Sequence, residues 1–257
     1  MTGALLVGFE YANSKEPLPG TEDDLASAIE YAKRISCDPL IIVSDVASYI
    51  RHPSYVSYKI SLEYILLRFR GCKRMVIYYS GHGTPRSWLL PDGRSIELET
   101  LARDVCALKI PEVVWILDSC CAWHLNLPYL LEKAYYRRIR EVLPSSRILC
   151  LLATQDLAWS TVSGSRFSRL FFSLLREGVR YLPTLVFRIG GIRVYSSRPG
   201  PLFLWEWMYG QTTRCSVEWN TNTIRVRSND QNTIRVRSND LPTTLDLLVH
   251  SINVFPP

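Results

Sequence analysis

Runs of consecutive apolar residues, each about as long as one β-strand, alternate along this chain with stretches of helical period. We expect strands at 4–9, 40–43, 73–79, 113–117 and 147–153, and helices at 21–35, 58–69, 98–108, 127–142 and 166–176. Strands that are apolar throughout and alternate with helices are typical of a parallel sheet covered on both faces. The pattern therefore predicts an α/β fold, and in such folds functional sites form outside the carboxyl ends of the strands.

Length and composition favour a single globular domain. The chain has 257 residues, of which 47% are hydrophobic and 21% are charged, so the signature of a disordered chain is missing. We expect one domain over 1–257, with a core in 1–180 and a strand-rich part in 181–257, where 185–188, 202–207 and 216–220 read as short strands. No run of about 18 apolar residues is present to span a membrane.

An intracellular, cytoplasmic protein is expected from two further observations. The first apolar run ends at Glu10 and has no basic residue ahead of it, which argues against a secretory signal. Seven cysteines at irregular spacing give neither a disulfide framework nor a paired metal-binding signature.

The charge is divided unevenly. Residues 1–128 hold 13 Lys and Arg against 15 Asp and Glu, whereas residues 129–257 hold 17 against 9. A basic surface attracts nucleic acid, but no nucleic-acid-binding motif accompanies these charges. We therefore place nucleic-acid binding last among the candidate functions.

The sequence of residues 222–230 recurs unchanged at 232–240. Each copy alternates with period two and ends in turn-forming residues, which predicts a β-hairpin extension. The hairpin would place four arginines on one face: Arg225, Arg227, Arg235 and Arg237. Arginines on an edge strand discourage pairing with a second copy, so we expect a monomer rather than a dimer.

Two polar motifs follow directly after apolar strands. Ser80-Gly-His-Gly83 follows the strand at 73–79, and Asp118-Ser-Cys-Cys121 follows the strand at 113–117. A thiolate is the reactive form of cysteine and needs a nearby histidine or positive dipole to be populated at neutral pH. We interpret Cys120 as a nucleophile, His82 as its proton-transfer partner and Gly83 as an oxyanion donor through its amide. Cys121 is the alternative nucleophile, and a buried thiol or a hydrogen-bonded core histidine is the alternative for either residue alone.

These motifs resemble the paired signatures of metacaspases, the caspase-like cysteine peptidases. Further matches lie in register over about residues 3–180: Ala4-Leu-Leu-Val-Gly, Pro19-Gly-Thr-Glu-Asp-Asp24, Leu127-Pro-Tyr129 and Ala153-Thr-Gln-Asp156. The resemblance implies a caspase-like three-layer sandwich with a mostly parallel six-stranded sheet. It also implies a His82/Cys120 dyad that hydrolyses peptide bonds.

Substrate preference follows from the same resemblance. Caspases, which cleave after Asp, have an Arg where this chain has Leu18 and a Gln where it has Asp118. An anion-binding group is thus missing and a carboxylate is present, which suits Arg or Lys. Asp24 would be the second carboxylate, and Ser80 would line the pocket. The alternatives are that Asp24 caps the helix starting at Thr21 and that Asp118 makes a structural hydrogen bond.

Calcium is disfavoured as a cofactor, and no other metal or cofactor is expected. Many metacaspases require calcium, which needs six to eight oxygen ligands. The loop at 84–97 keeps only Asp92 and Glu97, and Asn126 stands where the family tends to have Asp. We expect activity without calcium, on proteins or peptides with basic residues.

Two departures leave alternatives open. The nucleophile is followed by Cys121-Ala-Trp123 rather than the usual His-Ser-Gly, so a catalytically weak caspase-like scaffold or regulator is the competing function. Separately, three arginines are candidate self-cleavage sites, for which a solvated helix face is the alternative: Arg137, Arg138 and Arg140.

Overall fold

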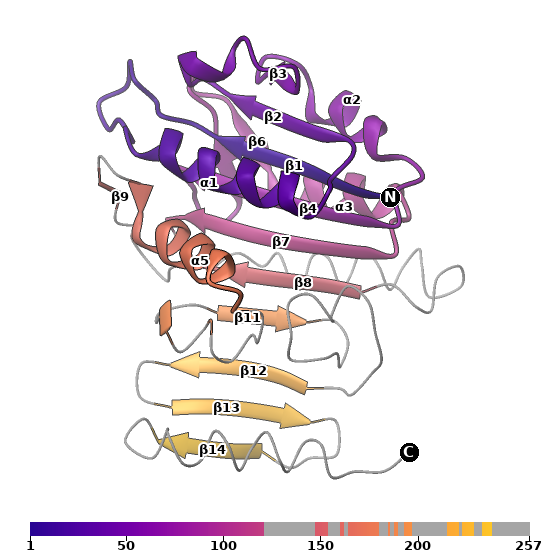
Figure 1. Ribbon diagram of the computed structural model, residues 1–257, viewed down its shortest axis with the longest axis vertical. Helices are drawn as coiled ribbons and strands as arrows, with labels where there is room; N and C mark the ends of the chain where they lie inside the picture. Colours follow the sequence, from indigo (N-terminus) through magenta and orange to yellow (C-terminus); the bar gives the residue numbers. More distant parts are fainter. Residues whose placement is uncertain are drawn as a thin grey trace.

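A seven-stranded sheet runs through the middle of the protein, in the strand order β11-β8-β7-β4-β1-β2-β3. Figure 1 shows the strands of this computed structural model stacked along its long axis. The structure describes residues 1–120, 147–153, 160–161, 164–179, 185, 188–189, 193–196, 215–220, 223–228 and 233–237. Six strands of the central sheet pair in parallel, and β11 joins one edge in the antiparallel direction. The predicted mostly parallel sheet is confirmed.

Five apolar runs identified in the sequence form strands of this sheet. They are β1 (Thr2–Gly8), β2 (Leu40–Ser44), β4 (Arg74–Gly81), β7 (Glu112–Ser119) and β8 (Arg147–Leu152). The sheet has seven strands where six were expected. Two of them, β3 (Tyr55–Ser57) and β11 (Arg193–Ser196), form its opposite edges. With three residues, β3 is too short to produce a recognisable periodic pattern.

Helices cover both faces of the sheet. One face carries α1 (Thr21–Arg34) and α5 (Arg166–Arg176), and the other carries α2 (Leu62–Leu66), the 3₁₀ turn η2 (Leu67–Phe69) and α3 (Leu98–Ala107). Side chains of β1 alternate between two cores: Leu5 and Val7 pack on the α3 side, and Ala4 and Leu6 pack on the α1 side. This alternation is the period of a strand buried on both faces, and it produces the three-layer α/β sandwich that was expected.

The helix expected at 58–69 is shorter in the structure. Only Leu62–Leu66 is α-helical, and Leu67–Phe69 continues it as a 3₁₀ turn. The buried residues Ile65, Leu66 and Phe69 account for the helical spacing of apolar residues seen in the sequence. The residues before Ser61 belong instead to the connection that leaves β3.

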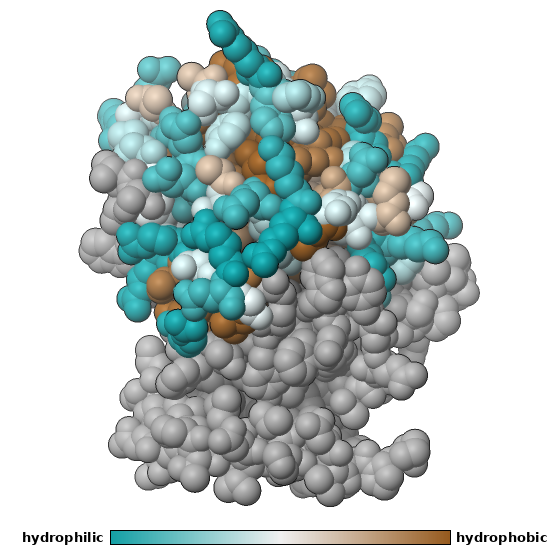
Figure 2. All heavy atoms as spheres, viewed as in Figure 1, coloured by the Kyte–Doolittle hydropathy of each residue, from teal (hydrophilic) through white to brown (hydrophobic). Residues whose placement is uncertain are grey.

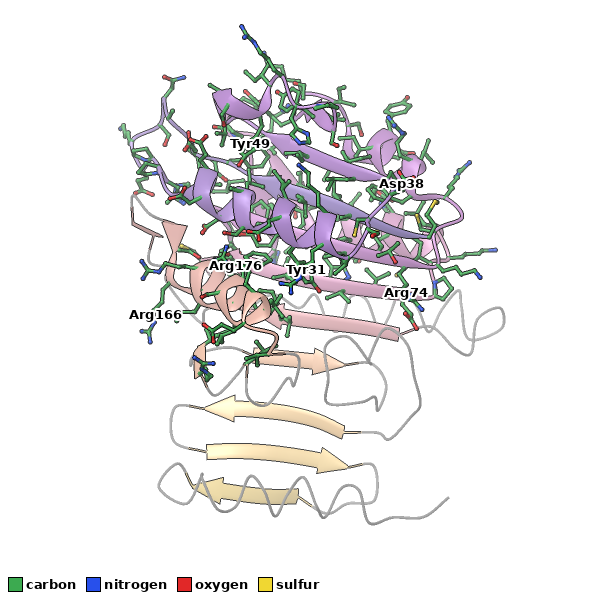
Figure 3. All side chains as sticks on the ribbon, viewed as in Figure 1. Tyr31, Asp38, Tyr49, Arg74, Arg166 and Arg176 are labelled. Atoms are coloured by element: carbon green, nitrogen blue, oxygen red, sulfur yellow. The ribbon has the colours of Figure 1, made fainter. Side chains whose placement is uncertain are left out.

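Contacts between α1 and α5 fix the helical layer nearest the reader in Figure 1. The Tyr78 ring of β4 contacts Phe172 of α5 with ring centroids 5.5 Å apart, and Tyr31 of α1 lies 6.0 Å from the same ring. At the outer rim Arg176 forms an ion pair with Glu30 of α1 at 3.2 Å, and Figure 3 shows Arg176 at the end of α5 that faces α1. The outer face of these helices is largely hydrophilic in Figure 2.

The chain between β4 and α3 forms a small hairpin. β5 (Ser87–Leu89) pairs antiparallel with β6 (Ser95–Glu97), and Gly93 supplies the positive φ of 84° that the intervening turn requires. Another short connection, the 3₁₀ turn η1 (Ala47–Tyr49), follows β2. None of the helices in the described ranges is both long and apolar enough to cross a membrane.

The duplicated segment forms the predicted hairpin. β13 (Thr223–Ser228) and β14 (Thr233–Arg237) pair antiparallel, and β12 (Cys215–Asn220) pairs with the other side of β13. Their register sets Arg225 opposite Arg235.

One strand expectation in the C-terminal part is wrong. Leu185, Arg188 and Ile189 are helical where a strand over 185–188 was expected. Leu185 and Ile189, four positions apart, are both buried in the core beside α1 and α5, which is the spacing of a helix face. The helix expected at 127–142 and the strand at 202–207 lie outside the described residues.

Candidate active site

The two polar motifs meet at one edge of the sheet because their strands are parallel neighbours. In the β4–β7 ladder, Ser80 pairs with Asp118 and Gly81 pairs with Ser119. His82 directly follows the end of β4, and Cys120 directly follows the end of β7. Since parallel strands end at the same edge, the chain delivers an imidazole and a thiol side by side.

The half-buried His82 side chain contacts the Cys120 side chain. A hydrogen bond with Cys120 raises the pKa of the imidazole, burial lowers it, and a contact with the Glu16 carbonyl raises it again, with a net increase. The Nε2 atom lies 2.6 Å from that carbonyl oxygen. Because a carbonyl can only accept, Nε2 carries the proton in this contact, and Nδ1 is the acceptor of the neutral ring.

Two tyrosine hydroxyls hold the main chain of His82. The His82 N–H donates to the Tyr11 hydroxyl at 3.0 Å, and the Tyr79 hydroxyl donates to the His82 carbonyl at 2.5 Å. Tyr79 is fully buried and stacks on Trp88 with centroids 4.2 Å apart. The main chain of His82 is therefore held in one position by these two hydrogen bonds.

Gly83 lies against the chain that carries the thiol. A Cβ atom at this position would be 3.0 Å from the Ser119 Oγ and 3.1 Å from the Cys120 carbonyl oxygen. Residue 83 also forms a β-bridge with Trp88 of β5. A side chain at position 83 would require Ser119 or the Cys120 carbonyl to move by a few tenths of an ångström.

Asp24 is buried on α1 and points to the sheet edge rather than capping the helix. Its carboxylate accepts hydrogen bonds from the Ser80 hydroxyl at 3.1 Å and from the Ser165 N–H at 3.0 Å. The helix is preceded by Gly20 with no side-chain cap. Thr21 is the first helical residue, and its hydroxyl donates to the Phe9 carbonyl at 3.1 Å. The cap interpretation of Asp24 is wrong, because its buried carboxylate is turned toward Ser80 and Ser165.

Asp118 occupies the end of β7 and is satisfied by the first turn of α5. Its Oδ2 atom accepts from the Ser165 hydroxyl, from the Ser168 hydroxyl at 2.7 Å and from the Ser168 N–H at 3.2 Å. The Ser168 Oγ also lies 2.6 Å from the Tyr78 hydroxyl. The structural hydrogen bond considered for Asp118 is therefore present.

The two carboxylates titrate abnormally because they are buried and close to each other. Burial, then the nearby charge of Asp118, raises the pKa of Asp24 to about 7, although the hydrogen bonds from Ser165 and Ser80 lower it. Burial likewise raises the pKa of Asp118, against the hydrogen bonds from Ser165 and Ser168. Both side chains are less than 5% exposed. Two buried carboxylates with raised pKa values therefore lie at the sheet edge where β4 and β7 end.

Four residues at this edge were not identified from the sequence. Ser165 and Ser168 join the carboxylates, Glu16 acts through a main-chain oxygen, and Tyr11 acts through its hydroxyl. Ser165 lies 141 positions from Asp24, so no local spacing relates them. Tyr11 alone carried a signal, since it follows the first strand on the side where sites form.

Several candidate residues cannot be located. Cys121, Asn126 and the possible self-cleavage sites Arg137, Arg138 and Arg140 lie outside the described residues. The matched segment 127–129 lies outside them as well.

The acidic residues considered for calcium are engaged with neighbours. Asp92 forms an ion pair with Arg94 at 2.8 Å, and Glu97 accepts a hydrogen bond from Ser95 at 3.2 Å. Within the described ranges, no group of three or more His, Cys, Asp or Glu side chains could hold a metal ion. Calcium independence stays a prediction.

The fold and the Cys/His pair at the ends of β4 and β7 define an α/β sandwich with a candidate thiol active site. No family model matches the chain, and no curated protein matches it. Among solved structures, a Geobacter sulfurreducens protein from a structural-genomics programme superposes with a TM-score of 0.50 at 15% identity, covering 83% of this chain and 97% of that chain. Caspase-1 from Spodoptera frugiperda gives a TM-score of 0.49 at 14% identity, covering 73% and 74%. These similarities concern the fold alone.

Proposed function

We propose that the protein is a cysteine endopeptidase that cleaves peptide bonds after Arg or Lys. The observation that carries the proposal is the hydrogen bond between His82 and Cys120 at the carboxyl ends of two adjacent parallel strands. The resemblance of both motifs to those of metacaspases supports the same reaction.

The proposed chemistry begins with transfer of the Cys120 thiol proton to Nδ1 of His82. The thiolate attacks the carbonyl carbon of the peptide, and the carbonyl π-electron pair moves to oxygen. The resulting tetrahedral intermediate collapses with cleavage of the C–N bond while the imidazolium protonates the departing amine. Water then attacks the thioester, His82 takes a proton from it, and the thiol and the carboxylic acid product are released.

Gly83 supports the step in which the oxyanion forms. Its main chain lies close to the loop that carries Cys120, because a Cβ atom on residue 83 would be only 3.1 Å from the Cys120 carbonyl oxygen. Its amide would donate a hydrogen bond to the oxyanion, and one such donor is typically worth about 10²–10³-fold in rate.

The preference for a basic side chain is supported by the two carboxylates. Asp24 and Asp118 lie at the sheet edge where β4 and β7 end, since Asp118 pairs with Ser80 and the Ser80 hydroxyl donates to Asp24. Leu18 stands where caspases have an anion-binding arginine. A guanidinium group is a five-donor fork. It would replace the hydroxyl and N–H donors that Ser165 and Ser168 now supply, and it would stabilise the ionised carboxylates.

A second function, partner binding without turnover, is favoured by one observation. Both carboxylates are already satisfied by Ser165, Ser168 and Ser80, and each is less than 5% exposed. In a regulatory protein these hydrogen bonds would remain in place, and the two carboxylates would stay buried. In a peptidase the segment that carries Ser165 has to yield to the substrate.

Peptide cleavage by the wild type, Cys120→Ala and the matched control Cys37→Ala tests the proposal. Cys37 is a second thiol of intermediate exposure, far from His82 in sequence. We expect cleavage of peptides with Arg or Lys before the scissile bond by the wild type and by Cys37→Ala, and none by Cys120→Ala. Equal cleavage by Cys120→Ala would end the proposal. No cleavage by any variant, together with no labelling by a basic chloromethyl ketone, would favour the binding protein.

A further inference from the structure

Tyr11 is held in a backbone conformation that side chains rarely adopt. Its φ is 53°, in the left-handed region. The Asp45 carboxylate accepts the Glu10 N–H at 2.7 Å and the Tyr11 N–H at 2.9 Å. Two charge-assisted hydrogen bonds thus stabilise the unfavourable turn, which directs the tyrosine ring toward the end of β4.

The Tyr11 hydroxyl joins a closed set of hydrogen bonds around His82. It accepts the His82 N–H at 3.0 Å and donates to the Leu89 carbonyl at 2.7 Å. The Tyr79 hydroxyl lies 3.2 Å away and donates to the His82 carbonyl. Both polar groups of the histidine main chain are therefore fixed, each by a different tyrosine.

The tyrosine ring also contacts the imidazole. The two ring centroids are 4.5 Å apart with an interplanar angle of 46°. Burial raises the pKa of Tyr11 to about 12, so its hydroxyl stays neutral near neutral pH and can accept and donate at once.

Gly81 makes this arrangement sterically possible. A Cβ atom at position 81 would lie 2.8 Å from the Tyr79 hydroxyl oxygen and 2.9 Å from the Tyr11 hydroxyl oxygen. The first glycine of the Ser-Gly-His-Gly motif is thus explained by the two hydroxyls, which no reading of the motif alone indicates.

We propose that Tyr11, braced by Asp45, is a positioning residue that sets the imidazole of His82 against the Cys120 thiol. The inference rests on the proposed function and names a residue that acts through His82 without touching substrate. With the main chain fixed on both sides and Nε2 held by the Glu16 carbonyl, the direction of Nδ1 is determined. Misplacement of a catalytic group by about 1 Å can cost about 10²-fold in rate, so the brace matters for reactivity.

The test compares Tyr11→Phe with Tyr58→Phe. The Tyr58 ring packs on Phe9 at 5.8 Å, as the Tyr11 ring does at 5.9 Å, but Tyr58 is not among the groups that contact His82. The rate of Cys120 alkylation by iodoacetamide is measured from pH 5 to 9, with fragmentation mass spectrometry to separate Cys120 from Cys121. This assay needs no substrate and responds to the thiolate population.

We expect Tyr11→Phe to alkylate Cys120 at least about fivefold more slowly at pH 6.5, with the midpoint of the curve moved to higher pH. Tyr58→Phe should retain the wild-type curve. A wild-type curve in folded Tyr11→Phe would overturn the proposal. If Tyr11→Phe does not fold, Asp45→Ala, which removes the acceptor of the Glu10 and Tyr11 N–H groups, is measured instead, and a wild-type curve there would overturn the proposal equally. Absence of peptide cleavage with a shifted curve would refute the peptidase but leave the positioning role standing.

Discussion

The hydroxyl of Ser165, at the start of α5, donates a hydrogen bond to the carboxylate of Asp118 at the end of β7. The N–H of the same serine donates to Asp24 at 3.0 Å. One residue therefore links two buried carboxylates, one from the sheet and one from α1. The first prediction concerns this link.

Replacing Ser165 with Ala should lower the free energy of unfolding by about 1.5–3 kcal/mol, the usual contribution of a hydrogen bond to a charged group. The hydroxyl also caps α5 by accepting the Ser168 N–H at 3.0 Å, so the loss falls at the upper end of that range. Urea unfolding at pH 7 measures the effect. Ser173→Ala, in the same helix, is the matched control and should change stability by less than about 0.5 kcal/mol. Equal stability of the two variants would contradict the prediction.

Stability should fall as pH rises from about 4 to about 7. Asp24 has an ordinary pKa of 3.8 when unfolded and a folded pKa of about 7. Between those values the native state binds more protons than the unfolded state, so each pH step upward costs stability.

Asp24→Asn should flatten this dependence, and Asp23→Asn should not, because Asp23 is the exposed neighbour on the same helix. The test is to measure the free energy of unfolding of the wild type and both variants at pH 4, 5, 6 and 7. Parallel curves for the wild type and Asp24→Asn would show that Asp24 does not titrate in this range. Since the pair with Asp118 is coupled, the measured midpoint belongs to both carboxylates.

Asp118→Asn should raise KM for peptides with Arg before the scissile bond at least about tenfold. Losing one member of a buried charge pair typically costs about 2–5 kcal/mol, and an amide still accepts hydrogen bonds from Ser165 and Ser168. Alkylation of Cys120 should keep its wild-type rate, which separates lost binding from a damaged dyad. An unchanged KM would place the recognition of basic side chains elsewhere.

Gly83→Ala should lower kcat about tenfold or more with a smaller effect on KM. The added Cβ atom must displace the Ser119 side chain or the Cys120 carbonyl, which lie 3.0 and 3.1 Å from its position, and small displacements of reacting groups are costly. Steady-state kinetics on one Arg peptide supply both constants. If KM alone rises, the amide serves binding rather than the transition state.

Peptide cleavage should proceed equally in excess calcium and in excess EDTA. Asp92, one of two acids left in the loop at 84–97, is paired with Arg94. Calcium prefers several carboxylate oxygens together. Activity that appears only with calcium and disappears with EDTA would refute this expectation.

The sequence predicted those helices and strands in which the buried apolar residues recur at the period of the structure that they form. The helix expected at 166–176 begins and ends at Arg166 and Arg176, because its buried phenylalanines and leucines recur at helical spacing. By contrast, Leu185 and Ile189 are helical although the short run around them resembled a strand. A short apolar run fits both structures until the surrounding core decides.

The candidate site was predictable only in part for a related reason. His82 and Cys120 could be named because each follows a strand directly, and parallel strands end together. Ser165 and Glu16 could not, since one reaches Asp24 from 141 positions away and the other contacts His82 through a main-chain oxygen that every residue possesses. Contacts of this kind come from tertiary assembly.

The link made by Ser165 also constrains the order in which the protein can mature during synthesis. Asp24 and Asp118 leave the ribosome well before α5, and until α5 docks they lack the donors of Ser165 and Ser168, although Asp24 keeps the Ser80 hydroxyl. A nascent chain that ends before residue 160 would keep this edge of the sheet hydrated and open. Completion of the carboxylate pair is thus tied to emergence of α5, so the site cannot mature ahead of the fold that encloses it.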